Sequence, residues 1–140
     1  MFCKMQIEYF TFLFDDAFCL QYANYINVHH FKGGEKTIYN TVNREYHNIY
    51  GPAVQSYWQN NSLQNTFYYI RGDLDRDYYP ALIYTTPNGN TLQIGHYKNN
   101  RLHNNYGPAA VTYHADGSIF QSMYFVDGLI QTFTKIECNA

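Results

Sequence analysis

Histidine, aspartate and cysteine side chains recur at one fixed spacing and are the strongest candidates for metal chemistry. His47, Asp75 and His103 are each 28 residues apart (75 − 47 = 28; 103 − 75 = 28), and Cys19 lies 28 residues before His47. On equivalent strands of a sheet with two strands per repeat, such neighbours would lie about 10 Å apart. The ligands of one zinc ion lie about 2.0–2.3 Å from the metal. We therefore expect structural roles for these side chains, with no metal site.

Other motifs with catalytic or metal-binding potential are incomplete. The segment from Asp73 to Asp77 begins like a calcium loop, but Tyr78 replaces the required glycine and Tyr84 the twelfth-position glutamate. The adjacent His29 and His30 would point to opposite faces of a strand. The sequence contains no GxSxG, P-loop or HExxH motif. It therefore predicts a protein that is not an enzyme and has no cofactor.

The charged residues limit the class of partner. Nine Lys and Arg residues are scattered and outnumbered by eleven Asp and Glu residues, which gives a formal net charge of −2. Binding to nucleic-acid phosphates requires clustered basic side chains, and attraction to anionic phospholipids depends on the same residues. We therefore expect no nucleic-acid partner, and we regard membrane binding as a weak alternative.

The cysteines and the N-terminal segment indicate the compartment. Cys3, Cys19 and Cys138 are odd in number and lack CxxC spacing, which argues against a disulfide framework and against a zinc module. Charged residues such as Lys4 and Glu8 interrupt the aromatic N-terminal segment. This segment therefore predicts neither a signal peptide nor a membrane span. We expect a soluble, cytoplasmic protein.

One tetrapeptide recurs at equal intervals. Tyr50-Gly51-Pro52-Ala53 returns as Tyr106-Gly107-Pro108-Ala109, and Tyr78-Tyr79-Pro80-Ala81 lies halfway between them (80 − 52 = 28; 108 − 80 = 28). A turn-forming pair follows each copy at the same distance: Asn60-Asn61, Asn88-Gly89 and Asp116-Gly117. Asn, Asp and Gly tolerate positive φ, which two-residue hairpin turns require at both central positions. We therefore predict a two-residue hairpin turn at each pair.

The segments between the turns are rich in β-branched and aromatic residues and show no sustained helical period. The sequence predicts an all-β fold, an elongated single-layer antiparallel meander of stacked β-hairpin repeats with a 28-residue period. One repeat domain spans residues 1–140. Its predicted parts are an N-terminal half-unit or cap (1–21), a degenerate unit (22–49), three full units (50–77, 78–105 and 106–133) and a tail (134–140).

These motifs carry a resemblance to a known family. Asp127-Gly128-Leu129-Ile130, Leu102-His103 and the recurring Tyr-Gly-Pro-Ala resemble the MORN-type repeat, in particular its longer variant with GPA and Leu-His elements, over about residues 12–133. The chain departs from the pattern at Tyr79, which replaces Gly, and at Asp75, which replaces His.

The resemblance has implications for function and origin. MORN-family arrays form elongated single-layer sheets that act as scaffolds or protein-interaction surfaces. The longer variant is abundant in large DNA viruses and occurs in some phages. The resemblance therefore implies a virus-encoded scaffold or interaction protein, either a virion component or an inhibitor of a host protein in the host cytoplasm.

Two aromatic columns supply the candidate binding residues. One column holds Tyr68, His96 and Tyr124, and the next holds Tyr69, Tyr97 and Phe125. Adjacent columns face opposite sides of a strand, and exposed aromatic area usually marks a binding surface. We expect a protein partner to bind there, with a glycan or phospholipid as the alternative ligand. The competing interpretation is that these rings only pack as cross-strand pairs. The predicted binding residues are Tyr69, Tyr97, Phe125, Tyr68 and Tyr124.

The N-terminal edge of the predicted sheet is a candidate for self-association. An open sheet leaves unpaired backbone groups at its edge strands, and these are templates for association. The aromatic segment Glu8–Phe14 falls at this edge. We expect it to be either capped by the tail or the seam of a homo-oligomer.

Overall fold

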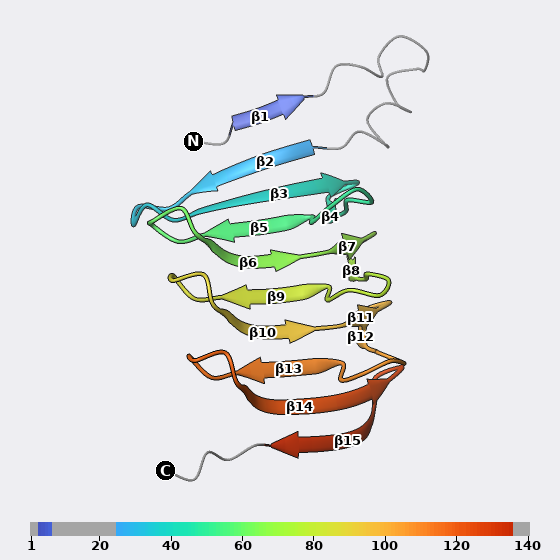
Figure 1. Cartoon of the computed structure of the whole chain (residues 1–140). Helices are drawn as coiled ribbons and strands as arrows, with labels where there is room; N and C mark the ends of the chain where they lie inside the picture. The colour runs from blue at the N-terminus through green and yellow to red at the C-terminus, as the bar shows by residue number, and fades with distance from the viewer. Residues whose placement is uncertain (1–2, 7–24, 136–140) are drawn as a thin grey trace.

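The computed structural model describes residues 3–6 and 25–135. Every regular element in these ranges is a β strand, and the strands form an open antiparallel meander with two small flanking hairpins (Figure 1). The predicted all-β fold class is confirmed. The main sheet has the order β1-β2-β3-β5-β6-β9-β10-β13-β14-β15, with β4 paired to β3. Its strands are β1 (Cys3–Gln6), β2 (Tyr25–His30), β3 (Lys36–Val42), β4 (Glu45–Tyr46), β5 (Val54–Tyr57), β6 (Leu63–Phe67), β9 (Leu82–Thr85), β10 (Thr91–Gly95), β13 (Ala110–Tyr113), β14 (Ile119–Val126) and β15 (Leu129–Lys135).

The interior of this single-layer sheet is thin. No large side chain of the described residues is fully buried, and the buried hydrophobic side chains are small. Ala53, Ala81 and Ala109 are each 0% exposed, and each is the last residue of a repeated tetrapeptide. Their backbone groups pair with the neighbouring strand, as in the 2.9 Å hydrogen bond from the Ala53 N–H to the Phe67 carbonyl. The alanine column is therefore where each loop joins the sheet.

The hairpin turns at one end of the strands lie at the predicted pairs but have a different geometry. The Trp58 N–H donates to the Ser62 carbonyl and the Asn61 N–H donates to the Trp58 carbonyl, both at 2.9 Å, which defines a three-residue loop. In each pair only the second residue has positive φ: Asn61 (62°), Gly89 (85°) and Gly117 (85°). The predicted two-residue turn is therefore wrong here. The Asn60 side chain accepts hydrogen bonds from the Ser62 N–H and hydroxyl at 3.0 and 2.6 Å, and this local bonding favours the longer loop.

The hairpins at the other end do have two-residue turns. β7 (Tyr69–Ile70) pairs with β8 (Asp73–Leu74), and β11 (Tyr97–Lys98) pairs with β12 (Arg101–Leu102). Both residues of each turn have positive φ, as in Arg71 (50°) and Gly72 (81°), which is the type I′ geometry. The same geometry joins β3 to β4 and β14 to β15, with turns at Asn43-Arg44 and Asp127-Gly128.

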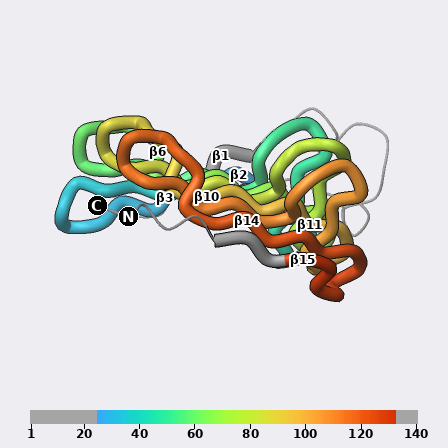
Figure 2. The backbone as a smooth tube through the Cα atoms, turned by 60° about the horizontal axis from the view of Figure 1, so that its bottom comes forward, coloured from blue at the N-terminus to red at the C-terminus, as the bar shows by residue number. Residues whose placement is uncertain are grey.

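The two-residue hairpins stack on one another at this end of the strands (Figure 2). In the last three of these hairpins the second turn residue donates its N–H to the hairpin before it, at 2.9 Å in each case: Gly72 to Tyr46, Asn100 to Leu74 and Gly128 to Leu102. These bonds form a second hydrogen-bonded ladder beside the main sheet. Each hairpin is thus held by its neighbour as well as by its own strands.

Equivalent elements begin at equal offsets within the described residues. The strands β5, β9 and β13 begin at Val54, Leu82 and Ala110 (82 − 54 = 28; 110 − 82 = 28). The segment Glu8–Phe14 and most of the predicted N-terminal half-unit lie outside the described residues. The 28-residue period of the whole chain and the N-terminal seam therefore remain predictions. No helix in the described part of the chain is long and apolar enough to cross a membrane.

Candidate functional site

The column of His47, Asp75 and His103 fastens neighbouring hairpins together. The Nδ1 atom of His47 accepts the Arg71 N–H at 3.0 Å, Asp75 Oδ2 accepts the Asn99 N–H at 3.0 Å, and His103 Nδ1 accepts the Asp127 N–H at 3.1 Å. Each donor is the first residue of the next two-residue turn. Among the described residues, no three His, Cys, Asp or Glu side chains are grouped so that they could hold a metal ion.

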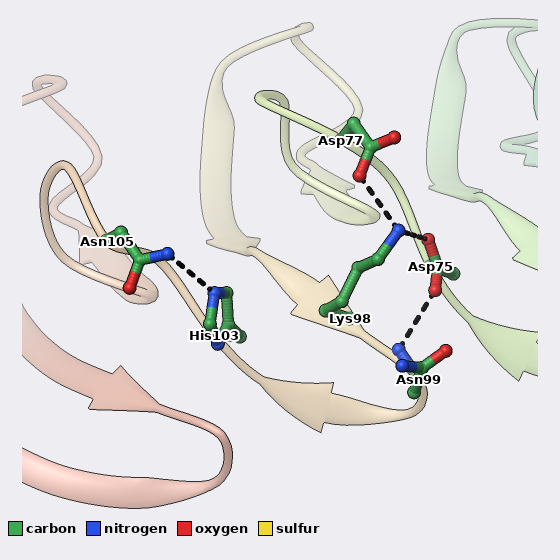
Figure 3. Close-up of polar contacts among 6 residues, drawn as sticks. All are labelled: Asp75, Asp77, Lys98, Asn99, His103 and Asn105. Carbon is green, nitrogen blue, oxygen red and sulfur yellow. Dashed lines mark hydrogen bonds and ion pairs between the residues drawn. The ribbon is translucent and has the colours of Figure 1, made fainter.

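An ion-pair cluster surrounds the central member of this column. The Lys98 ammonium lies 2.9 Å from Asp75 Oδ1 and 2.8 Å from Asp77 Oδ1 (Figure 3). The hydrogen bond to Asp77, followed by the one to Asp75, raises the pKa of Lys98 above its ordinary value. His103, in the next unit, lies with its Nε2 atom 3.1 Å from the Asn105 side-chain nitrogen. The cluster ties the loop after β8 to the hairpin of the following unit.

A side chain clamps each loop that carries the repeated tetrapeptide. The Asn48 side-chain amide donates to the Pro52 carbonyl at 3.1 Å and accepts the Tyr50 N–H at 3.0 Å. Asn104 holds Pro108 and Tyr106 in the same way, at 3.0 Å in both bonds. In the middle loop, Arg76 instead donates to the Pro80 carbonyl at 3.0 Å. Its guanidinium lies 3.7 Å from the centre of the Tyr68 ring. The loops are therefore fixed in shape.

The middle loop has an unusual backbone. Tyr78 has a φ of 65°, and the Tyr79 N–H donates to the Asp77 carbonyl at 2.8 Å, which closes a tight three-residue turn around Tyr78. Positive φ is uncommon for a bulky side chain, and such residues store about 1–3 kcal/mol of strain each. Strained residues cluster at functional sites. The turn leaves the neighbouring Tyr78 and Tyr79 rings both exposed.

These loops present a row of exposed tyrosines, which we call the tyrosine ridge: Tyr50, Tyr78 and Tyr106. These residues are 89%, 81% and 86% exposed. The loops precede β5, β9 and β13, which are separated from one another by one intervening strand (Figure 1). Neighbouring tyrosines are therefore about 10 Å apart along the sheet.

An open groove of about 530 Å³ lies between the first two loops. Its lining residues include Ile49, Tyr50, Pro52, Tyr68, Arg76 and Asp77.

The predicted aromatic binding residues lie mostly in packed positions. Tyr69 is half-buried, with its ring 5.3 Å from that of Tyr46 and 6.3 Å from that of Phe67. Burial, followed by the neighbouring Tyr46, raises the pKa of Tyr69, and burial, followed by Tyr84, raises that of Tyr97.

The other predicted residues have mixed exposure. Tyr68 is half-buried beneath Arg76, Phe125 is half-buried, and Tyr124 is exposed. The structure therefore leaves most of these rings half-buried, and only Tyr124 is exposed.

The tyrosine ridge was not among the binding residues predicted from the sequence. A usable signal was present, because Tyr50, Tyr78 and Tyr106 are identical in the three full units while the residue after each of them varies. An aromatic residue kept in a loop is a stronger indication of binding than one kept in a strand, where packing explains it. The exposure of these side chains depends on the conformation of the loops, which the sequence alone did not predict.

Comparison with known proteins yields no relative. No protein-family model, curated protein or solved structure gives a significant match to the chain.

Proposed function

We propose that this protein is a non-catalytic interaction module that binds a protein partner along the tyrosine ridge. The observation that carries the proposal is the exposure of Tyr50, Tyr78 and Tyr106, each of which is more than 80% exposed on a hydrogen-bonded loop. Large aromatic side chains left in water at regular intervals have no packing role, and exposed apolar area of this kind marks interaction surfaces.

The chemistry of the ridge suits a protein partner. Tyrosine is enriched at interface hot spots, since it supplies a large contact area and a hydroxyl at small entropic cost. The clamped loops have lost their conformational freedom before binding, which lowers the cost of association. A repeat array offers the same contact several times, so recognition is spread over successive units. The resemblance to MORN-type scaffolds agrees with this proposal.

Capture of partners from a cell lysate tests it. The immobilised protein is compared with a ridge variant, Tyr50→Ala/Tyr78→Ala/Tyr106→Ala. A matched control variant, Phe31→Ala/Leu92→Ala/Ile119→Ala, removes exposed apolar side chains at or near the opposite hairpin ends. Circular dichroism checks that all three proteins are folded.

We expect a specific partner that binds the wild type and the control alike and is lost from the ridge variant. Loss of three hot-spot rings costs a few kcal/mol, or about a hundredfold or more in affinity. Equal capture by the ridge variant contradicts the proposal. Binding of a glycan or phospholipid array without any protein partner supports the ligand-binding alternative instead.

A further inference from the structure

The C-terminal end of the sheet uses its backbone acceptors differently from the interior units. In the interior, the carbonyls of Tyr46, Leu74 and Leu102 each accept an N–H from the next hairpin at 2.9 Å. Ile130 is the next residue of this column (130 − 102 = 28) and lies in the edge strand β15. In the described part of the chain, no further strand follows β15 in the sheet. The Ile130 carbonyl therefore occupies an acceptor position for which the described residues supply no next hairpin.

The direction of the Ile130 backbone groups follows from the turn. Val126 and Leu129 close a two-residue hairpin, and the closing pair of such a turn is hydrogen-bonded on the inner side. The N–H and C=O of the next residue, Ile130, then point away from β14. These groups face the open edge of the sheet.

β15 also occupies the place of a strand that is paired on both sides elsewhere. Met123 of β14 pairs with Phe133 of β15, just as Phe67 of β6 pairs with Leu82 of β9. β9 is then paired on its other side by β10. β15 is thus positioned to accept one more antiparallel strand.

The side chains of β15 carry little of the charge that exposed edges usually have. Natural edge strands are blunted by charged residues or by β-bulges, and β15 has one register shift, opposite Tyr124 and Phe125. The column position of Leu129 holds Glu45, Asp73 and Arg101 in the earlier units. Leu129 is 69% exposed and Ile130 is 58% exposed. The only charged residue of β15 is Lys135, at its end.

We propose that β15 is a dimerisation strand that pairs antiparallel with β15 of a second copy of this chain. A two-fold axis at the edge satisfies the outward backbone groups of both copies and continues the antiparallel order of the sheet. The symmetry sets each strand against itself, where like charges would repel. The stretch from Leu129 to Thr134 carries no charge, so two copies of it can face each other without that repulsion.

Sedimentation velocity of the full chain over a range of concentrations, combined with a charge variant, tests the dimer. Leu129→Arg introduces the residue type found at Arg101 in the same column, so the substitution is compatible with the fold. It places two like charges at the seam, and we expect it to raise the dimer dissociation constant about tenfold. Leu92→Arg, at an exposed position in β10, is the matched control and should leave the constant unchanged.

Cross-linking locates the seam independently of affinity. Thr132→Cys, in a background with Cys3→Ser, Cys19→Ser and Cys138→Ser, should form a disulfide-linked dimer on mild oxidation. Thr91→Cys in the same background should not. A monomer at all concentrations overturns the proposal. A dimer that is insensitive to Leu129→Arg, or that Thr132→Cys fails to cross-link, overturns it as well. Neither result depends on the tyrosine ridge.

Discussion

His47, Asp75 and His103 differ in chemistry but make the same contact, since each accepts a backbone N–H from the next two-residue turn. Their spacing along the sequence indicates that they do not converge on one ion. Their actual partners could not be predicted, because the contact depends on how far one hairpin stacks over the next. Asp75 also shows why the column tolerates a change of residue type. A carboxylate can accept the N–H that an imidazole accepts elsewhere.

Removing the Asp75 carboxylate should loosen the central units. Asp75→Ala removes the acceptor of the Asn99 N–H and one of the two carboxylates paired with Lys98. We expect the free energy of unfolding to fall by about 1–2 kcal/mol, the range for a hydrogen bond to a charged group that is partly open to water. Denaturant unfolding measures this loss. Asp73→Ala, at an exposed neighbouring position, is the control. Equal effects of the two substitutions would contradict the role of Asp75 in holding the next turn.

His96 should make stability depend on pH. Burial of the ring, followed by the charge of Arg76, lowers the pKa of His96 from its ordinary value of 6.5. The unfolded chain therefore binds more protons than the folded chain below about pH 6.5. The contribution of His96 to the free energy of unfolding is fully present above that pH and is lost as the pH falls below it. We expect Tm to decrease on acidification, and to decrease less in His96→Tyr, which carries the residue found at Tyr68 and Tyr124. An identical pH profile for both proteins would rule out this contribution.

At the scale of elements, the positions of the hairpins could be predicted but their geometry only in part. Pairs such as Asn60-Asn61 mark a turn because they tolerate positive φ, and the turn is present. At Asn60 and Asp116 the longer loop is accompanied by side-chain hydrogen bonds to the following serine, which the residue pair alone does not reveal. The break between β6 and β7 at Tyr68 was also not predicted, because an aromatic run looks like one continuous strand. This break carries Tyr69 and Tyr97 into packed positions.

The packing of the β11–β12 hairpin against the sheet can be tested at Gly95. A Cβ atom at this position would lie 2.7 Å from Cε2 of the Tyr97 ring, which is too close without displacement of the ring. We expect Gly95→Ala to lower the free energy of unfolding by about 1–3 kcal/mol, as overpacking does elsewhere. Gly107→Ala is the control, since the nearest atom there is 3.8 Å away. Equal free energies of unfolding for the two variants would mean that the Tyr97 ring does not pack closely against Gly95.

At the scale of the whole molecule, the meander sets the loops of the recurring tetrapeptide before alternate strands of the sheet, and this arrangement underlies the proposed binding surface. The all-β meander followed from turn pairs and strand composition, both of which are local. The tyrosine ridge depends on where the chain leaves the sheet and on the clamps by Asn48 and Asn104. Both depend on how a loop lies relative to the ends of its own strands. The repeated tetrapeptide alone therefore predicted a break between strands, but not the exposure of its tyrosine. The tyrosines of these tetrapeptides are the candidate site because the structure shows them exposed.

Site-specific photo-cross-linking tests the central claim most directly. A benzoylphenylalanine residue is placed in turn at Tyr50, Tyr78 and Tyr106, and for comparison at Phe31, an exposed aromatic residue at the opposite hairpin end. Irradiation in lysate is followed by identification of the attached proteins. The ridge account predicts that the three ridge positions attach to the same partner and that Phe31 does not. Attachment of that partner at Phe31, with none at the three ridge positions, would contradict it.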